Sequence, residues 1–463
     1  MTFVMHLAQC YHMNRVKNML LFIMLFLSQN FFAQNKWTLD DCVAYALTHN
    51  LTLDNLRYAT ESNKEIYKQS YRDLLPSISA NSSYNIQYGR SVDPNNNTII
   101  STDFFSNNYS LSASLDIFRG FQKMNSIKAA NFLYKATKEE ELQEKYLLAF
   151  RVMSAFYDIL FFQELVTIAK EQEKISLKNY RLVIKQIELG LKAGVDKYEA
   201  ESLLITDRLK ITQSENSLKA AKLQLIQEMN LENTSVIEID TILEDIEKQE
   251  GKYNVEADSV YQKSLSFIPI IRAQEFRVKA AKKDIAVARS SLMPSLSLSG
   301  GYGTGYFETN TNDLNEVIPF KTQIRDNASQ FIGFSLRIPI SDGWSVRSRV
   351  KQQKIALDRA SNNLEIQKQE LNKLIRELVQ NYRATQNEYS QTKQNEKARF
   401  LAFSISQKRY DKGLISAIEL FQSKNLYATA QNENLQVKLK LKVQRKTIDF
   451  YEGLPVFTIN KNN

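Results

Sequence analysis

The scarce and clustered glycines and prolines constrain the fold of this chain more than any motif does. Its 463 residues include only 13 glycines and 7 prolines, where average proteins contain roughly 7% and 5% of these residues. Four long stretches contain neither residue and are rich in Leu, Ala, Lys, Glu and Gln, which favour helix. At 1.5 Å per residue, one helix over the first stretch would be about 100 Å long, too long for a compact globular domain. The stretches are 121–189, 195–250, 344–412 and 414–452.

Apolar residues within these stretches keep helical spacing. Leu204, Ile211, Leu218 and Leu225 lie seven residues apart, as in a seam between packed helices. Each pair of stretches is separated only by a short glycine-containing turn, so each pair is predicted to fold back as an antiparallel helical hairpin.

The segments between the long stretches alternate with a period of two. In the first of them, Ile78 and Tyr84 share one parity while Ser79 and Ser83 share the other. Segments of this length can cross a bilayer at a tilt, with a Ser- and Asn-rich face toward a water-filled lumen and tyrosines at the interface. The edge of a soluble β-sandwich alternates equally well, but a sandwich needs more than four strands. Transmembrane strands are therefore predicted at 77–88, 107–118, 295–306 and 330–341.

The chain contains two copies of one unit. Each copy reads helix, strand, loop, strand, long helix, turn, helix, which predicts structural repeats at 34–250 and 251–463. Three pairs of segments carry the match: 74–79 with 292–297, Gly120-Phe121 with Gly343-Trp344, and the turn glycine Gly194 with Gly413.

Four strands cannot close a barrel, and an unpaired strand edge would leave backbone groups unsatisfied in lipid. The strands are therefore expected to close between chains. Two chains would form an eight-stranded barrel filled by side chains, whereas three would form twelve strands with room for a duct. The sequence favours three chains only if the protein transports something.

The first 33 residues are predicted to be an export signal. Arg15 and Lys17 form a basic region, an apolar run follows from Met19 to Leu27, and Ala33 is a plausible cleavage site. The run is too short to span a membrane, and a buried N-terminal helix is the alternative. Met13 fits as the start of this signal better than Met1 does.

After cleavage at this site, Cys42 would be the only cysteine that remains and His49 the only histidine. Disulfides, zinc clusters and histidine-based catalytic triads are then difficult to build. We therefore expect no cofactor, no metal and no enzymatic activity.

The formal net charge is +9, with a basic run near the C-terminus. Such a run could bind nucleic acid. An exposed helix face is the better interpretation, because an exported protein meets little nucleic acid and no binding motif accompanies the charge. The basic residues are Lys438, Lys440, Lys442, Arg445 and Lys446.

After residue 35 the chain resembles the TolC-like outer-membrane efflux proteins. The resemblance rests on the opening 37–42 with Ala44–Asn50, two Leu-x-Pro-Ser strand entries, two glycine-aromatic strand exits and the two glycine turns. It implies a mixed α and β membrane protein, internally duplicated, in which four transmembrane strands per chain contribute to a trimeric 12-stranded barrel. A long antiparallel α-helical tunnel would continue through the periplasm, and the barrel would contact outer-membrane lipid. Small molecules would pass passively through this duct to the exterior.

The resemblance also implies partners and functional positions. The turns at Gly194-Val195 and at Arg409, Gly413 and Leu414 would dock a periplasmic adaptor protein, which couples the duct to an inner-membrane pump. These glycines could instead only permit a tight turn. Glu419 would form an acidic ring in the lumen, although a single glutamate on a helix is more often a solvated residue.

Three other functions share some of these features. The outer-membrane component of a type I protein secretion system uses the same kind of tunnel and is the nearest alternative. A trimeric coiled-coil adhesin or stalk would have long helices and an export signal, but would lack duplicated strand pairs. A hydrolase with paired carboxylates ranks last, because no carboxylate pair lies in an apolar, pocket-like context.

Overall fold

The computed structural model describes residues 36–92, 97–101, 103–232, 236–240, 255–314 and 316–457. The predicted export signal at 1–33 lies outside these residues. The chain divides into two compact units, each drawn from both halves of the sequence. Among the described residues, the first unit draws on 36–50, 148–240 and 385–443, and the second draws on 51–147, 255–384 and 444–457.

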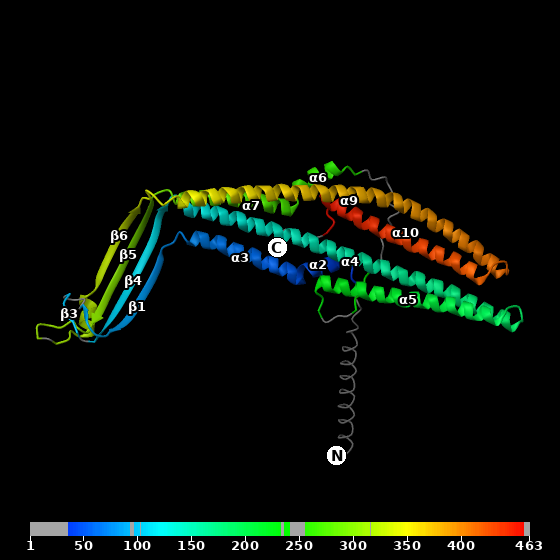
Figure 1. The fold of residues 1–463 in the computed structure, drawn as a ribbon, viewed down its shortest axis with the longest axis horizontal. Helices are drawn as coiled ribbons and strands as arrows, with labels where there is room; N and C mark the ends of the chain where they lie inside the picture. The colour runs from blue at the N-terminus through cyan, green and yellow to red at the C-terminus, as the bar shows by residue number, and fades with distance from the viewer. Residues whose placement is uncertain are drawn as a thin grey trace, which may run out of the picture. The chain divides into compact units, whose positions relative to one another are not determined.

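The long helices are confirmed. They are α4 (Gln122–Glu188), α5 (Gly194–Met229), α9 (Ser345–Asp411) and α10 (Ala417–Tyr451) (Figure 1). The helix in the second stretch is shorter than the sequence allowed, because Asn230 adopts a left-handed conformation with φ of 52° and caps α5. A left-handed residue after the last turn is a common way to end a helix.

Five shorter helices complete the described part of the chain. Two of them lie before residue 77, two lie between residues 257 and 290, and α8 lies in the loop before the last strand. In α2, the Thr38 Oγ accepts a hydrogen bond from the Asp41 amide at 3.2 Å, and the Asp41 carboxylate accepts one from the Thr38 amide, which forms a capping box. The bounds are α2 (Leu39–His49), α3 (Leu51–Arg72), α6 (Ala257–Leu265), α7 (Pro269–Ser290) and α8 (Phe320–Asp326).

Four of the strands form one antiparallel sheet in the second unit. They are β1 (Ser77–Gln87), β4 (Phe104–Arg119), β5 (Ser295–Phe307) and β6 (Ser329–Arg337), and they pair in the order β1-β4-β5-β6. A small separate pair, β2 (Ser91–Val92) and β3 (Ile99–Ile100), lies between β1 and β4 in sequence.

All four predicted strands are present, but the last one ends earlier than residue 341. Its partner β5 begins at Ser295, directly opposite Arg337, so no partner backbone remains beyond that pair. Pro339, two residues further on, also lacks the N–H that a ladder requires.

The two faces of the sheet differ in chemistry, as the alternation predicted. On one face, Ser77 pairs with Ser114, and Ser114 pairs with Ser299. The hydroxyl oxygens of Ser77 and Ser114 lie 2.7 Å apart. The large apolar residues on this face are Phe331, which packs on Gly301, and Phe104 and Phe307 near the far end of the strands. The other face is apolar and largely exposed, with Ile78, Leu111, Leu115, Leu298, Tyr302, Ile332, Phe334 and Leu336.

The junctions between strand and long helix repeat the same unusual backbone. Gly120 and Phe121 have φ of 57° and 64°, and Gly343 and Trp344 have 60° and 67°. Two consecutive left-handed residues are rare, and the second is a bulky aromatic residue in both cases. The two junctions that the sequence matched thus share one backbone conformation.

Each unit has its own core. In the first unit, α2 packs on α5, and the Asn50 side-chain amide donates to the Glu228 carbonyl at 3.0 Å. Trp37 also forms a parallel bridge with Ile239. In the second unit, Arg277 on α7 donates two hydrogen bonds to Glu140 on α4, at 2.8 and 2.9 Å. The long helices are therefore held by polar contacts as well as by apolar packing.

Candidate functional site

The two turns that close the helical hairpins of the first unit share one geometry. Gly190 and Gly413 both have φ of 72°. After each glycine, an amide donates back to a carbonyl in the last helical turn: Leu191 to Gln186 at 2.8 Å and Leu414 to Arg409 at 2.9 Å. This pattern satisfies carbonyl groups that would otherwise lack partners at a helix end.

The structure corrects one pairing that we made from the sequence. The left-handed glycine equivalent to Gly413 is Gly190, whereas Gly194 begins α5 and is not left-handed. Gly413 lies 223 residues after Gly190, the same interval that separates Gly120 from Gly343. The sequence match of Gly194 with Gly413 was wrong. It rested on residue type alone, whereas the equivalent glycines of the two turns are those with the same left-handed backbone conformation.

Both turns expose apolar side chains. Val195 is 66% exposed and Leu414 63% exposed, and single-residue exposure of this kind needs no explanation by itself. Here, however, the exposed side chains gather on two adjoining turns, which is typical of a surface that binds a partner. The group consists of Leu189, Leu191, Val195, Tyr198, Leu414 and Ile418.

The two charged residues predicted near the turns have clear local roles. Arg409 is exposed in the last turn of α9, and its carbonyl accepts from the Leu414 amide. The Glu419 carboxylate accepts from the Ser416 amide at 3.5 Å and from the Ser416 hydroxyl at 3.0 Å, while the Glu419 amide donates to the Ser416 hydroxyl at 3.2 Å. The two bonds that involve backbone amides form a capping box at the start of α10.

A cavity of about 400 Å³ lies between the turns and includes Gln186, Tyr410 and Glu419 in its lining. The buried Oε1 of Gln186 and the Tyr410 hydroxyl find no hydrogen-bond partner among the described residues. Burial, with added repulsion from Asp196 and Asp411, raises the pKa of the Tyr410 phenol. The phenol therefore remains protonated and can donate a hydrogen bond into this cavity.

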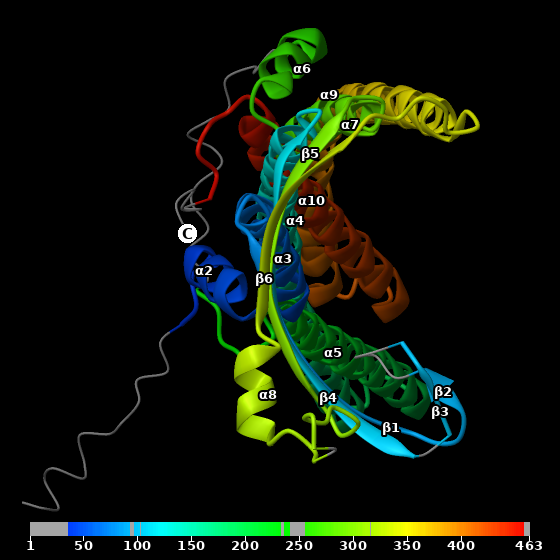
Figure 2. The same ribbon diagram turned by 90° about the vertical axis from the view of Figure 1, so that its left-hand side faces the viewer.

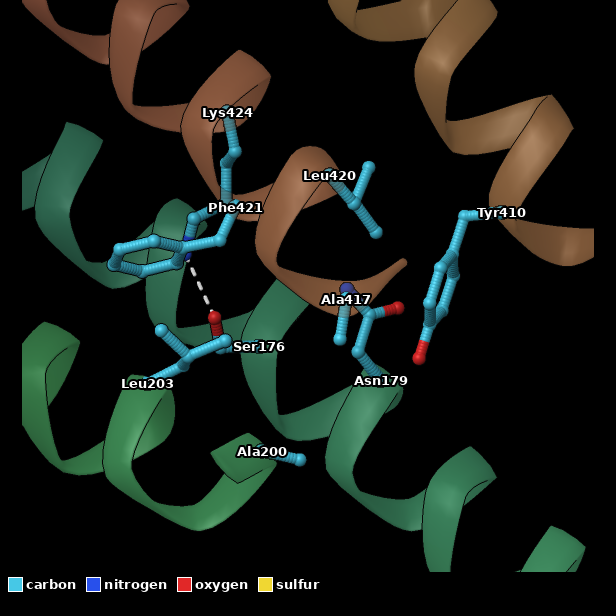
Figure 3. A pocket seen from close by; sticks show the side chains of 9 residues that line it. All are labelled: Ser176, Asn179, Ala200, Leu203, Tyr410, Ala417, Leu420, Phe421 and Lys424. Carbon is cyan, nitrogen blue, oxygen red and sulfur yellow. Dashed lines mark hydrogen bonds between the residues drawn. The ribbon is translucent and has the colours of Figure 1, made fainter. Parts of the chain in front are cut away.

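Further from the turns, a charged network joins three helices. Lys424 on α10 pairs with Asp207 on α5. Its ammonium also donates to the Ser176 hydroxyl of α4 at 2.7 Å (Figure 3). Ser176 donates to the same Asp207 oxygen at 2.6 Å. Burial lowers the pKa of Lys424, and the hydrogen bond and charge of Asp207 oppose that shift.

A cavity of about 20 Å³ adjoins this network and is lined by Asn179, Leu203 and Lys424, among others. That space holds about one water molecule. Sequence reasoning missed this network. One signal was available: Asp207 lies three residues after Leu204, within the predicted apolar seam, where a charged residue requires a partner.

Together these features define a class of protein. A duplicated chain joins long helical hairpins to a sheet with two open edges, one polar face and one exposed apolar face, which is the construction of an outer-membrane channel subunit. The model of the outer membrane efflux protein family matches residues 43–230 and 260–453. The chain therefore belongs to this family of outer-membrane proteins.

Curated relatives agree with this assignment. The chain is 24% identical over 304 residues to the outer membrane protein TolC of Vibrio cholerae, covering 65% of this chain and 64% of that protein. It is 22% identical over 259 residues to nodulation protein T of Rhizobium leguminosarum, covering 53% and 48%. The matched region thus spans about half to two thirds of the length of these relatives.

Solved structures share the fold. The CmeC outer membrane channel of Campylobacter jejuni matches with a TM-score of 0.76 at 16% identity, covering 91% of this chain and 87% of that chain. The MtrE outer membrane channel of Neisseria gonorrhoeae, in its open state, matches with a TM-score of 0.70 at 19% identity, covering 91% of both chains. At these identities the likeness establishes the fold alone.

Proposed function

We propose that this protein forms the outer-membrane exit duct of a tripartite efflux system, through which small molecules leave passively. The observation that carries the proposal is the sheet: β1 and β6 stand at its edges, one face is polar and the other is apolar and exposed. Such a sheet is stable in a bilayer only after its edges have paired.

Pairing between three copies fits this sheet best. Three chains would supply twelve strands, with the Ser-, Asn- and Gly-rich face around a water-filled lumen and the apolar face toward lipid. Eight strands from two chains would leave room only for side chains. The homotrimer is therefore part of the proposal.

The two glycine turns are proposed to dock a periplasmic adaptor, which links the duct to an inner-membrane pump. Support comes from the exposed side chains of Val195 and Leu414 and from the polar cavity between the turns. Arg409, Gly194 and Gly413 would contribute through the shape and charge of the turns. Three copies of Glu419 would attract cations at the same end of the duct.

Channel formation is tested by purifying the protein from outer membranes, counting subunits by cross-linking and recording single channels in planar bilayers. A trimer with discrete, cation-preferring openings supports the duct, and Glu419→Gln should reduce that preference. A monomer, or a trimer that never conducts even after the turns are loosened by substitution, contradicts the proposal.

Docking is tested separately with Leu414→Asp and Val195→Asp. A charge at either position should abolish co-purification of the adaptor while leaving single-channel conductance intact, because the turn is exposed and packs against nothing that folding requires. Leu401→Asp is the matched control, since Leu401 is 53% exposed on α9 away from the turns. If all three variants bind the adaptor equally well, the turns are not part of the docking surface.

Export of a protein substrate, as in a type I secretion system, remains the second candidate for the same duct. The two are distinguished by deleting the gene. Efflux predicts accumulation of small toxic compounds and an unchanged set of secreted proteins, whereas secretion predicts the loss of a specific protein from the medium.

A further inference from the structure

The described residues between β5 and β6, 308–314 and 316–328, form a folded segment that is held firmly against the end of β5. Its centre is Gln323 on α8, which is 1% exposed. The Gln323 side chain donates to the carbonyls of Phe307 and Ile318, at 3.0 and 2.8 Å, and accepts from the Phe307 amide at 3.0 Å. A buried amide with these bonds satisfied specifies one position for the segment.

The segment lies on the apolar side of the sheet. The Thr304 hydroxyl donates to the Ile324 carbonyl, and Thr304 shares its face with Tyr302 and Tyr306. The rings of Tyr306 and Phe320 lie 5.5 Å apart, which leaves Tyr306 only 9% exposed. Figure 2 shows α8 on the convex side of the curved sheet.

An aromatic row extends this contact across the sheet. Tyr84 of β1 stacks on Phe105 of β4 at 5.6 Å, Phe105 contacts Tyr306 at 5.3 Å, and Tyr306 contacts Phe320. The row lies at the end of β4 that is remote from its junction with α4. Aromatic rings with one polar end are typical of the boundary between lipid chains and headgroups.

Ahead of α8, a tight turn presents an apolar tip. The Asn312 side-chain oxygen accepts from the amides of Leu314 and Glu316, at 3.0 and 2.9 Å, and Thr311 bridges Val317. Leu314 is nevertheless 78% exposed, and Val317 and Phe320 are 47% and 48% exposed. The backbone thus holds the Leu314 side chain away from the protein, while Val317 and Phe320 are about half exposed.

We propose that Leu314, Val317 and Phe320 form a lipid-contacting collar that inserts into the outer leaflet at the boundary between headgroups and acyl chains. This inference rests on the proposed barrel, because it takes the apolar face of the sheet as the lipid-facing one. The collar adjoins that face through the contact between the rings of Phe320 and Tyr306. Lipid is favoured over a soluble partner because the exposed groups are apolar and adjoin the surface that already requires lipid.

The test uses tryptophan fluorescence in proteoliposomes whose phospholipids carry bromine near the top of the acyl chain. The full-length protein contains two tryptophans, so Trp37→Phe with Trp344→Phe is the background. Leu314→Trp reports on the collar, and Val317→Trp repeats the measurement if the first variant does not assemble. Phe334→Trp marks the apolar face of the sheet, and Val92→Trp, 54% exposed on β2, is the control from the other loop.

The expected result is that brominated lipid quenches Leu314→Trp as strongly as Phe334→Trp, while Val92→Trp responds only to a water-soluble quencher. If Leu314→Trp behaves like Val92→Trp while Phe334→Trp is quenched, the collar is wrong and the barrel stands. If both quenchers fail to reach Leu314→Trp, a neighbouring protein covers the segment and the collar is again wrong. If Phe334→Trp itself escapes lipid, the barrel proposal fails, and the collar fails with it.

Discussion

Lys424 and Asp207 form an ion pair in which each side chain is only 1% exposed. The two residues come from the two different helical hairpins of the first unit, α10 and α5, and Ser176 of α4 completes the contact. Removing two charges from water is costly, so such a pair contributes less to net stability than to the choice of one arrangement of the helices.

Replacing only one residue of this ion pair should strongly destabilise the protein. Lys424→Met leaves the Asp207 carboxylate buried without its cation, and should lower the free energy of unfolding by about 3–5 kcal/mol. Chemical denaturation followed by helical circular dichroism measures the change.

The matched control for this prediction is Lys170→Met. Lys170 pairs with Glu215 at 2.9 Å, but the side chains are 52% and 42% exposed, so its loss should cost at most about 1 kcal/mol. The double variant Lys424→Met with Asp207→Leu should recover most of the stability, because no uncompensated charge remains. If Lys424→Met lowers the free energy of unfolding no more than Lys170→Met does, the role of the buried pair is contradicted.

The thiol of Cys42 should be unreactive in the folded protein. Burial, aided by the nearby charge of Asp41, raises the pKa of this thiol from 9.0 to about 12, and the thiolate is the reactive form. Because the folded pKa is the higher one, the thiol's contribution to stability is complete below pH 9 and is lost as the pH rises toward 12.

Labelling with a maleimide reagent across this range tests the prediction for Cys42. The native protein should resist labelling at neutral and mildly alkaline pH and react promptly once denatured. Val92→Cys, on the exposed β2 strand, is the positive control and should react in the folded protein. Labelling of native Cys42 at the same rate as that control would show that the site is open.

The duplication provides a matched pair of glycines at the strand-to-helix junctions. Gly120 and Gly343 have nearly the same φ, but an added Cβ at Gly120 would lie 2.7 Å from the Ser290 carbonyl oxygen, and at Gly343 it would meet nothing within 4 Å. Gly343→Ala should therefore lower the free energy of unfolding by about 1–2 kcal/mol, from backbone strain alone. Gly120→Ala should lower it by clearly more, because the steric clash adds to that strain. Denaturation midpoints of the two variants measure this difference, and equal costs would contradict it.

The first turn offers a second comparison. Gly190→Ala places a Cβ on a left-handed residue and should destabilise the hairpin by about 1–2 kcal/mol. Gly194→Ala, in the first turn of α5 with open space around it, should be neutral or slightly stabilising. Thermal unfolding of the two variants distinguishes the positions, and the reverse order would restore Gly194 as the turn-forming glycine.

Several features of this protein could be predicted from the sequence because they depend on local periodicity. The long helices follow from stretches without glycine or proline, and the two-faced strands follow from alternation of Ile78 and Ser79 and their successors. The repeat follows from short segments that match in the same order in both halves of the chain. Two of the matched segments, Gly120-Phe121 and Gly343-Trp344, are left-handed at both residues. Each of these signals lies within a few residues of the structure that it predicts.

The tertiary structure alone decided the features that depend on distant residues. Lys424 meets Asp207 across 217 residues of chain, and nothing near either residue identifies the other. The same holds for Gln323, whose partners place α8 on the apolar face. Local periodicity determines which elements form, whereas side-chain packing between them determines which polar groups are buried together.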